Sequence, residues 1–163
     1  MLKLRPLPAT ITGNEPFYLT VTWFQSGRIS PASGSWGSLA AWPVCWLVKY
    51  LGGTPAIAVF ALAAIVAGYW SIKEYSKHIK QHDPSEIVID EVIGMALMWL
   101  FIPAHSLIWA LIGFVAFRLL DSLKPGPIGW CDRQIKGSSG IIVDDVIAGL
   151  VAGLSVVLLR IVF

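Results

Sequence analysis

The chain has 163 residues, of which 56% are hydrophobic and only 13% are charged, and its mean hydropathy is +0.70. Soluble domains carry about 25% charged residues, so this composition favours a single membrane domain, residues 1–163, over a soluble bundle with an unusually apolar core. The net charge of +2 and the lack of an arginine-rich tract give no indication of nucleic-acid binding. The two cysteines have no metal-ligand spacing, which indicates buried thiols.

In chain order, residues 1–25 predict an extended lead-in that ends in a short interfacial helix at 15–25. Residues 26–38, SGRISPASGSWGS, are rich in Gly, Ser and Pro and predict a loop. The rest predicts an all-α, polytopic membrane bundle with four to five short spans plus interfacial helices. Each segment is shorter than the roughly 20 residues of a full crossing, so tilted or partly interfacial helices are expected. The expected spans lie near 36–51, 56–73, 90–102, 106–120 and 144–162.

The distribution of charge along the chain predicts an orientation. The turns at 52–55 and 103–106 contain no Lys, Arg, Asp or Glu, whereas segments 73–91 and 118–145 carry most of the charge. If the helices alternate in direction, both charged segments lie on one side of the membrane. Because positive residues favour the cytoplasmic side, we expect these segments to face the cytoplasm.

Two similar stretches place paired carboxylates inside apolar sequence. They are IVIDEVIGM at 87–95 and IIVDDVIAG at 141–149. The predicted topology makes each acidic pair open a helix at the same membrane face, where the helix macrodipole stabilises negative charge. Two pairs on two helices can supply several oxygen ligands to one centre, and this ligand type suits Mg²⁺. The alternative is helix capping with salt bridges to nearby Arg and Lys side chains.

Other polar groups are expected at the same face. Arg118, Asp121 and Lys124 follow an R-x-x-D-x-x-K pattern that places them along one helix face, where Arg118 or Lys124 could bind a phosphate. The alternative is an ordinary helix end whose long side chains reach toward water. Small residues at 30–38 precede a helix and could form an anion site. The segment 128–136, IGWCDRQIK, predicts an interfacial helix.

The sequence lacks the motifs that several known phosphatase mechanisms require. Neither cysteine has an arginine six residues later, since these positions hold Leu51 and Gly137. The aspartyl-phosphate motif D-x-D-x-[TV] and the G-x-S-x-G elbow are both absent from the sequence. Metal-assisted attack on phosphorus, by water or by a carboxylate, remains.

Four motifs together resemble the phosphatidylglycerophosphatase A family of bacterial membrane lipid phosphatases. They are SGRISPASGSWGSLAA, IVIDEVIGM, FRLLDSLKPGPIGWCDR and GIIVDDVIAG, and they span roughly residues 26–150 in the family's order. The resemblance implies Mg²⁺-dependent removal of the terminal phosphate of phosphatidylglycerophosphate, which gives phosphatidylglycerol. Two positions depart from the family pattern: P-G-T reads Ser33-Gly34-Ser35, and K-P-W-P reads Lys124-Pro125-Gly126-Pro127.

The resemblance also implies which residues form the site. The implied metal ligands are Asp90, Glu91, Asp144 and Asp145. The implied catalytic residues are these four together with Arg118, Asp121, Lys124 and Asp132. The implied substrate-binding residues are Ser30, Gly34, Ser35, Gly37, Ser38, Arg118 and Lys124.

Two other functions stay open at this point. A CDP-alcohol phosphotransferase also uses membrane carboxylates and metal, but its D-G-x-x-A-R motif is absent. A non-enzymatic ion-binding or transport subunit should carry its carboxylates near mid-membrane, not at helix starts. The expected setting is the bacterial inner membrane, with a multi-pass chain, a cytoplasm-facing site and a phospholipid substrate. The oligomeric state is left open.

Overall fold

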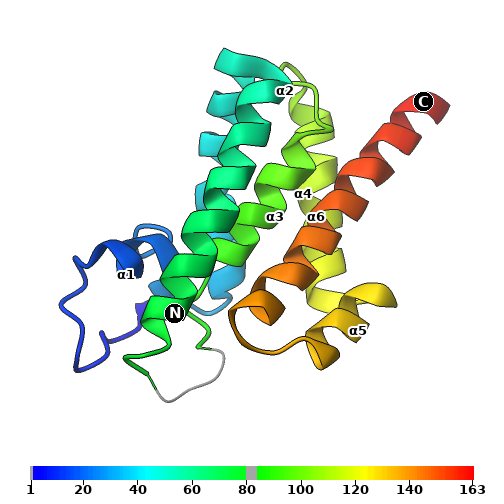
Figure 1. Cartoon of the computed structure of the whole chain (residues 1–163). Helices are drawn as coiled ribbons and strands as arrows, with labels where there is room; N and C mark the ends of the chain where they lie inside the picture. Colours follow the sequence, from blue (N-terminus) through cyan, green and yellow to red (C-terminus); the bar gives the residue numbers. More distant parts are fainter. Residues whose placement is uncertain (1, 80–83) are drawn as a thin grey trace.

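The computed structural model describes residues 2–79 and 84–163, and most of them are helical. Figure 1 shows the helices gathered in one bundle, with α1 and α5 near the same end of it. A pair of two-residue strands is an addition to the expected all-α class. In chain order the elements are β1 (Lys3–Leu4), α1 (Pro16–Val21), η1 (Ser26–Arg28), β2 (Ile29–Ser30), α2 (Ser33–Tyr75), α3 (Ile89–Trp99), α4 (Leu107–Leu123), α5 (Pro127–Gln134) and α6 (Gly137–Val162).

Helix α2 is a hairpin of two helical arms that meet at Gly53 (Figure 1). Gly53 has φ 65° and ψ −158°, a conformation that glycine adopts without steric cost. Both ends of α2 contact the same short segment: Ser33 donates a hydrogen bond to the Ser85 carbonyl, and the Tyr75 hydroxyl donates to Glu86. The expected turn at 52–55 is therefore confirmed, although the helical assignment runs through it.

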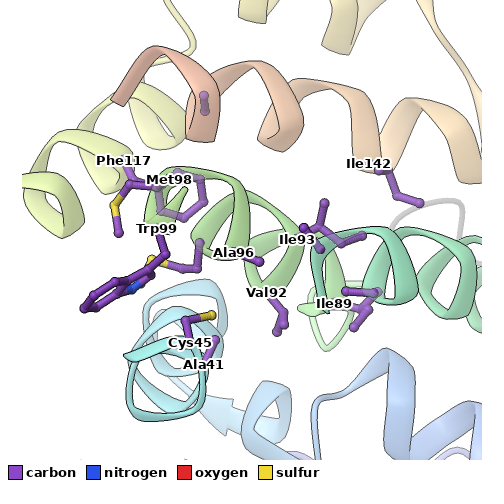
Figure 2. Close-up of a cluster of buried hydrophobic side chains, with 14 of the residues drawn as sticks. Ala41, Cys45, Ile89, Val92, Ile93, Ala96, Met98, Trp99, Phe117 and Ile142 are labelled. Carbon is purple, nitrogen blue, oxygen red and sulfur yellow. The ribbon is translucent and has the colours of Figure 1, made fainter. Parts of the chain in front are cut away.

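Helix α3 lies in the middle of the bundle, packed against α2 on one side and α6 on the other. Figure 2 shows Ala41 and Cys45 of α2 and Ile142 of α6 on opposite sides of α3. Eight of the eleven residues of α3 are buried, because a helix between two neighbours has apolar contacts around most of its circumference. The first turn of α3, which carries Asp90 and Glu91, is thereby held rigidly.

The lead-in forms less helix than expected. Helix α1 ends at Val21, and Trp23, Phe24 and Gln25 all have positive φ, so the predicted helix at 15–25 is too long. Left-handed residues cannot continue a right-handed helix. The backbone N–H of Val88 donates to the Val21 carbonyl, which ties the lead-in to the residues just before α3.

Two helix starts differ from the sequence expectation. The Gly/Ser segment was expected to be a loop through residue 38, but α2 already begins at Ser33. The second acidic pair was expected to open a helix, but α6 begins at Gly137, seven residues before Asp144. Low helix propensity predicted loops here, but propensity is a weak guide that the surrounding structure can override. In the first turn of α6, Gly140 lies close to the preceding backbone, since a Cβ there would lie 2.2 Å from the Ile135 carbonyl oxygen.

Two of the described helices, α2 and α6, are long and apolar enough to cross a membrane. The outer face of the second α2 arm exposes apolar side chains, including Val59, Leu62 and Val66. An apolar surface of this kind suits a lipid environment better than water. The structure therefore indicates a membrane protein.

Candidate active site

A polar cavity of about 320 Å³ lies where the start of α3, the end of α4 and the first turns of α6 meet. Six carboxylates and two lysines line it, among other residues, at one end of an otherwise apolar bundle. Every carboxylate that the sequence assigned to the site lines this cavity. They are Asp90, Glu91, Asp121, Asp132, Asp144 and Asp145.

The carboxylates form two groups of three that share Asp145. Oxygen atoms of Asp90, Glu91 and Asp145 lie within 4.8 Å of one another, and so do those of Asp121, Asp144 and Asp145. The two acidic pairs therefore meet in one cluster, as the sequence predicted. Asp121 joins the cluster as a further oxygen donor, although the metal set implied by the family resemblance omitted it.

Glycines allow α3 and α6 to approach closely enough for this cluster to form. Gly94 follows Asp90 by four residues, and Gly149 follows Asp145 by four, so each glycine lies one turn from its carboxylate on the same face. A Cβ on Gly149 would lie 2.2 Å from the Gly94 carbonyl oxygen. The repeated acid-to-glycine spacing is thus a sequence signal for the helix crossing.

Three carboxylate oxygens in the cavity are buried without a hydrogen-bond partner among the described residues: Glu91 Oε2, Asp144 Oδ1 and Asp145 Oδ2. The residues Asp144 and Asp145 are only 5% and 2% exposed. Buried carboxylates close together cannot remain ionised without a compensating cation. Hard oxygen donors with no His or Cys among them fit Mg²⁺. These three residues, with Asp90 and Asp121, are the groups that could hold such an ion.

Arg118 lies beside the carboxylate cluster, in the last two turns of α4. Its Nη1 donates to Asp121 Oδ2 at 2.7 Å and to Ser38 Oγ at 3.2 Å, and Glu91 Oε1 lies 3.9 Å away. Its Nε is buried and has no acceptor among the described residues. The guanidinium is thus fixed in orientation and keeps a donor free.

Lys124 links α4 to α5 and α6. Its Nζ lies 2.5 Å from Asp132 Oδ1 and 2.6 Å from Asp144 Oδ2. Burial by itself would lower the pKa of this ammonium group, but the hydrogen bonds and charges of the two carboxylates outweigh it and raise the pKa above its usual range. Lys124 has a left-handed backbone (φ 45°), and Pro125 follows it, so α4 ends here. Its charge holds Asp144 in place.

The predicted phosphate-binding segment contributes only part of its residues to the site. A Cβ on Gly34 would lie 2.0 Å from Glu91 Oε1, and buried Ser38 accepts from Arg118. Ser33, which lies in the predicted 30–38 segment but was not among the substrate-binding residues implied by the resemblance, lines the cavity. Gly37 instead packs against Val88.

Ser30 and Ser35 also belong to the predicted phosphate-binding segment. Ser30 pairs with Lys3 in the two-stranded sheet, and neither Ser30 nor Ser35 is among the residues that line the cavity. The substrate-binding role of these two serines therefore stays a prediction.

The comparisons with known proteins agree with this geometry. The profile of the family described as phosphatidylglycerophosphatase A matches residues 19–160. The chain belongs to this family. The matched region includes the whole carboxylate cluster, all of α3, and α6 up to residue 160. The resemblance seen in the sequence motifs is thereby confirmed.

Curated relatives carry the same family name. A phosphatidylglycerophosphatase A of Escherichia coli (strain K12) is 35% identical over 139 residues, which cover 85% of this chain and 80% of the relative. Another, of Haemophilus influenzae, is 34% identical over 138 residues, 85% of each chain. A putative phosphatidylinositol-3-phosphatase of Bacteroides thetaiotaomicron is 31% identical over 146 residues, 83% of this chain and 90% of the relative. No solved structure gives a significant match.

Proposed function

We propose that this chain is a Mg²⁺-dependent lipid phosphatase that hydrolyses phosphatidylglycerophosphate to phosphatidylglycerol and inorganic phosphate. The observation that carries the proposal is the cluster of buried carboxylate oxygens without partners, next to a fixed arginine and at the end of apolar helices. Membership in the phosphatidylglycerophosphatase A family supports the same substrate. The reaction would belong to glycerophospholipid biosynthesis.

The donor set supports a divalent cation as cofactor. The ligands would come from Asp90, Glu91 and Asp145 on one side and from Asp121, Asp144 and Asp145 on the other. A bound Mg²⁺ would offset the carboxylate charge and polarise the phosphate that is hydrolysed. The shared position of Asp145 makes it the ligand whose loss should disturb both groups.

Protein side chains would bind and orient the phosphate. Arg118 is not among the residues that line the cavity, but its guanidinium lies beside the carboxylate cluster, where its charge would stabilise the negative charge that develops on the phosphate. Asp121 and Ser38 hold the guanidinium in the required orientation. Lys124, already paired with Asp132 and Asp144, is a positioning residue that keeps Asp144 oriented toward the cavity.

The membrane arrangement that we propose has four to five spans in the bacterial inner membrane, with the cavity on the cytoplasmic side. The reversal of α2 at Gly53 supports the count, because it divides this long helix into two antiparallel arms. The uncharged turns at 52–55 and 103–106 support the orientation. Cysteines introduced at Thr54 and His105 should react with an impermeant thiol reagent added outside the cell, whereas one introduced at Arg133 should not.

A direct assay tests the proposed function. Purified protein should release inorganic phosphate from phosphatidylglycerophosphate in the presence of Mg²⁺, and Asp145→Asn should abolish that release. Phosphatidylinositol 3-phosphate is the second substrate to try, since the Bacteroides relative bears that name. Release of CMP from a CDP-linked lipid would favour the phosphotransferase alternative. Folded protein that turns over no phosphomonoester would favour an ion-binding subunit.

A further inference from the structure

The cavity is lined by two lysines whose electrostatic surroundings differ. Lys124 is held by two carboxylates at 2.5 and 2.6 Å. Lys136 also lines the cavity, but it is exposed, and no carboxylate of the described residues lies within salt-bridge distance of it. An exposed lysine far from any site is usually only solvated. Lys136, in contrast, faces an acidic cavity and remains available to an anion that enters it.

The position of Lys136 adds backbone donors to its ammonium group. It immediately precedes α6, and no side chain caps the first N–H groups of this helix. These N–H groups carry the positive end of the helix dipole. Asp144 and Asp145 lie on the same helix, eight and nine residues further on, and their unpaired oxygens border the same cavity. Eight residues of helix rise by roughly 12 Å, so Lys136 and the first N–H groups of α6 form a basic region of the cavity that is separate from the carboxylates of Asp144 and Asp145.

We infer that Lys136 and the start of α6 bind a second phosphate of the substrate, the phosphodiester, while the carboxylate cluster takes the terminal phosphomonoester. This inference rests on the proposed function. Phosphatidylglycerophosphate carries both groups, joined by a glycerol unit. The phosphodiester is an anion next to a strongly acidic cavity, and a free cation there would offset the repulsion. Lys136 would thus select lipids with two phosphates over lipids with one.

The test compares two substrates and three variants, all with Mg²⁺ present. Phosphatidylglycerophosphate has the phosphodiester and the phosphomonoester, whereas phosphatidic acid has only the phosphomonoester. Lys136→Ala should raise the KM for phosphatidylglycerophosphate by about tenfold, the usual loss for a charge-assisted hydrogen bond, with kcat unchanged. The KM for phosphatidic acid should not move. Lys136→Arg should restore most of the affinity.

Arg133→Ala is the matched control. Arg133 is exposed on α5, three residues from Lys136, and does not line the cavity, so its loss removes the same charge without touching the subsite. Equal KM changes for both substrates, or equal changes in Lys136→Ala and Arg133→Ala, would show general attraction to the lipid surface and overturn the inference. An unchanged KM in Lys136→Ala would overturn it as well.

A binding measurement separates this inference from the proposed function. Short-chain phosphatidylglycerol carries the phosphodiester alone, and its affinity can be measured in detergent without turnover. Wild type and Arg133→Ala should bind it equally, and Lys136→Ala about tenfold more weakly. A wild type that releases no phosphate from phosphatidylglycerophosphate contradicts the proposed function. Equal binding by wild type and Lys136→Ala contradicts the subsite, whatever the phosphatase assay gives.

Discussion

The two ends of the helical bundle both bury charged side chains, but they do so in different ways. At the end near the Gly53 reversal, buried Lys49 donates to Thr54 Oγ1 at 2.8 Å and to the Leu100 carbonyl at 3.0 Å. At the other end, the carboxylates of Glu91, Asp144 and Asp145 keep buried oxygens without partners among the described residues. The buried ammonium group at one end has hydrogen-bond acceptors within the protein, whereas the buried carboxylate oxygens at the other end have no donors among the described residues.

This difference separates a structural role from a functional one. Burying an unpaired charge is costly, so a fold retains it only where something outside the chain compensates. Lys49 has a structural role, because its hydrogen bond to the Leu100 carbonyl connects the first arm of α2 to the end of α3. The carboxylate cluster lacks such internal compensation, and this is the pattern of a site that binds a cation and a phosphate. Variants of the carboxylate cluster should therefore lose activity but not stability, whereas variants of Lys49 should lose stability but not activity.

The largest effect is expected for Asp145→Asn. This change removes the carboxylate that both triads share, and we expect kcat to fall on the order of a thousandfold. Thermal stability should stay equal or rise, because the substitution removes buried charge repulsion. Phosphate release and melting temperature are measured on the same preparation. A marked fall in melting temperature that accompanies the loss of phosphate release would mean that the cluster has a structural role.

Arg118 should rank next. Arg118→Ala should lower kcat by about a hundredfold, because it removes a charge that Asp121 and Ser38 hold in place. Arg118→Lys keeps the charge but not the forked geometry, so it should recover only part of the loss. Steady-state kinetics of both variants check this. Full activity in Arg118→Lys, with reduced melting temperature in Arg118→Ala, would mean that the residue only anchors the end of α4.

Gly34→Ala should have an intermediate effect. The added Cβ would lie 2.0 Å from Glu91 Oε1, so the carboxylate must move away from its place in the cluster. We expect a loss of activity on the order of tenfold, since small displacements in an active site lower the rate strongly. The Mg²⁺ concentration required for half-maximal activity should rise with it. Wild-type kinetics at every Mg²⁺ concentration would show that Glu91 does not take part.

The smallest effect on activity is expected at the opposite end. Lys49→Met keeps the length of the side chain but leaves the Leu100 carbonyl without its donor. Stability should fall by about 1–3 kcal/mol, while kcat stays within about twofold of wild type. Melting temperature and phosphate release are again measured together. A large loss of kcat without loss of stability would remove the distinction between the two ends.

Much of this arrangement could be predicted from the chain. The repeated acidic pairs in apolar flanks predicted one shared cluster, and the uncharged turns predicted where the helices reverse. The helix starts at Ser33 and Gly137 could not be predicted, because local propensity favours loops at Gly and Ser and only packing makes these segments helical. The acid-to-glycine spacing, Asp90 to Gly94 and Asp145 to Gly149, was present in the sequence. Its role in the close approach of α3 and α6 could be recognised only from the folded structure.

The detailed assignment of the site was harder to predict. Asp121 was expected to be a catalytic residue on the same helix face as Arg118. It forms an ion pair with Arg118, and it also lies within the second carboxylate triad. Lys136 carried no sequence signal that set it apart from ordinary polar residues, and only the folded chain places it at the cavity. Ser33 lies within the 30–38 segment expected to bind an anion, but the implied substrate-binding set omitted it. Side-chain contacts between distant helices depend on the register of packing, which a single sequence does not specify.

Direct binding of Mg²⁺ tests the central claim, that the unpartnered carboxylates form a cation site. Calorimetric titration of metal-free protein with Mg²⁺ is compared for wild type, Asp145→Asn and Lys49→Met. The site described here predicts saturable binding in wild type and Lys49→Met, and binding at least tenfold weaker in Asp145→Asn. Saturable binding of equal affinity in all three proteins, or no binding in wild type, would contradict it.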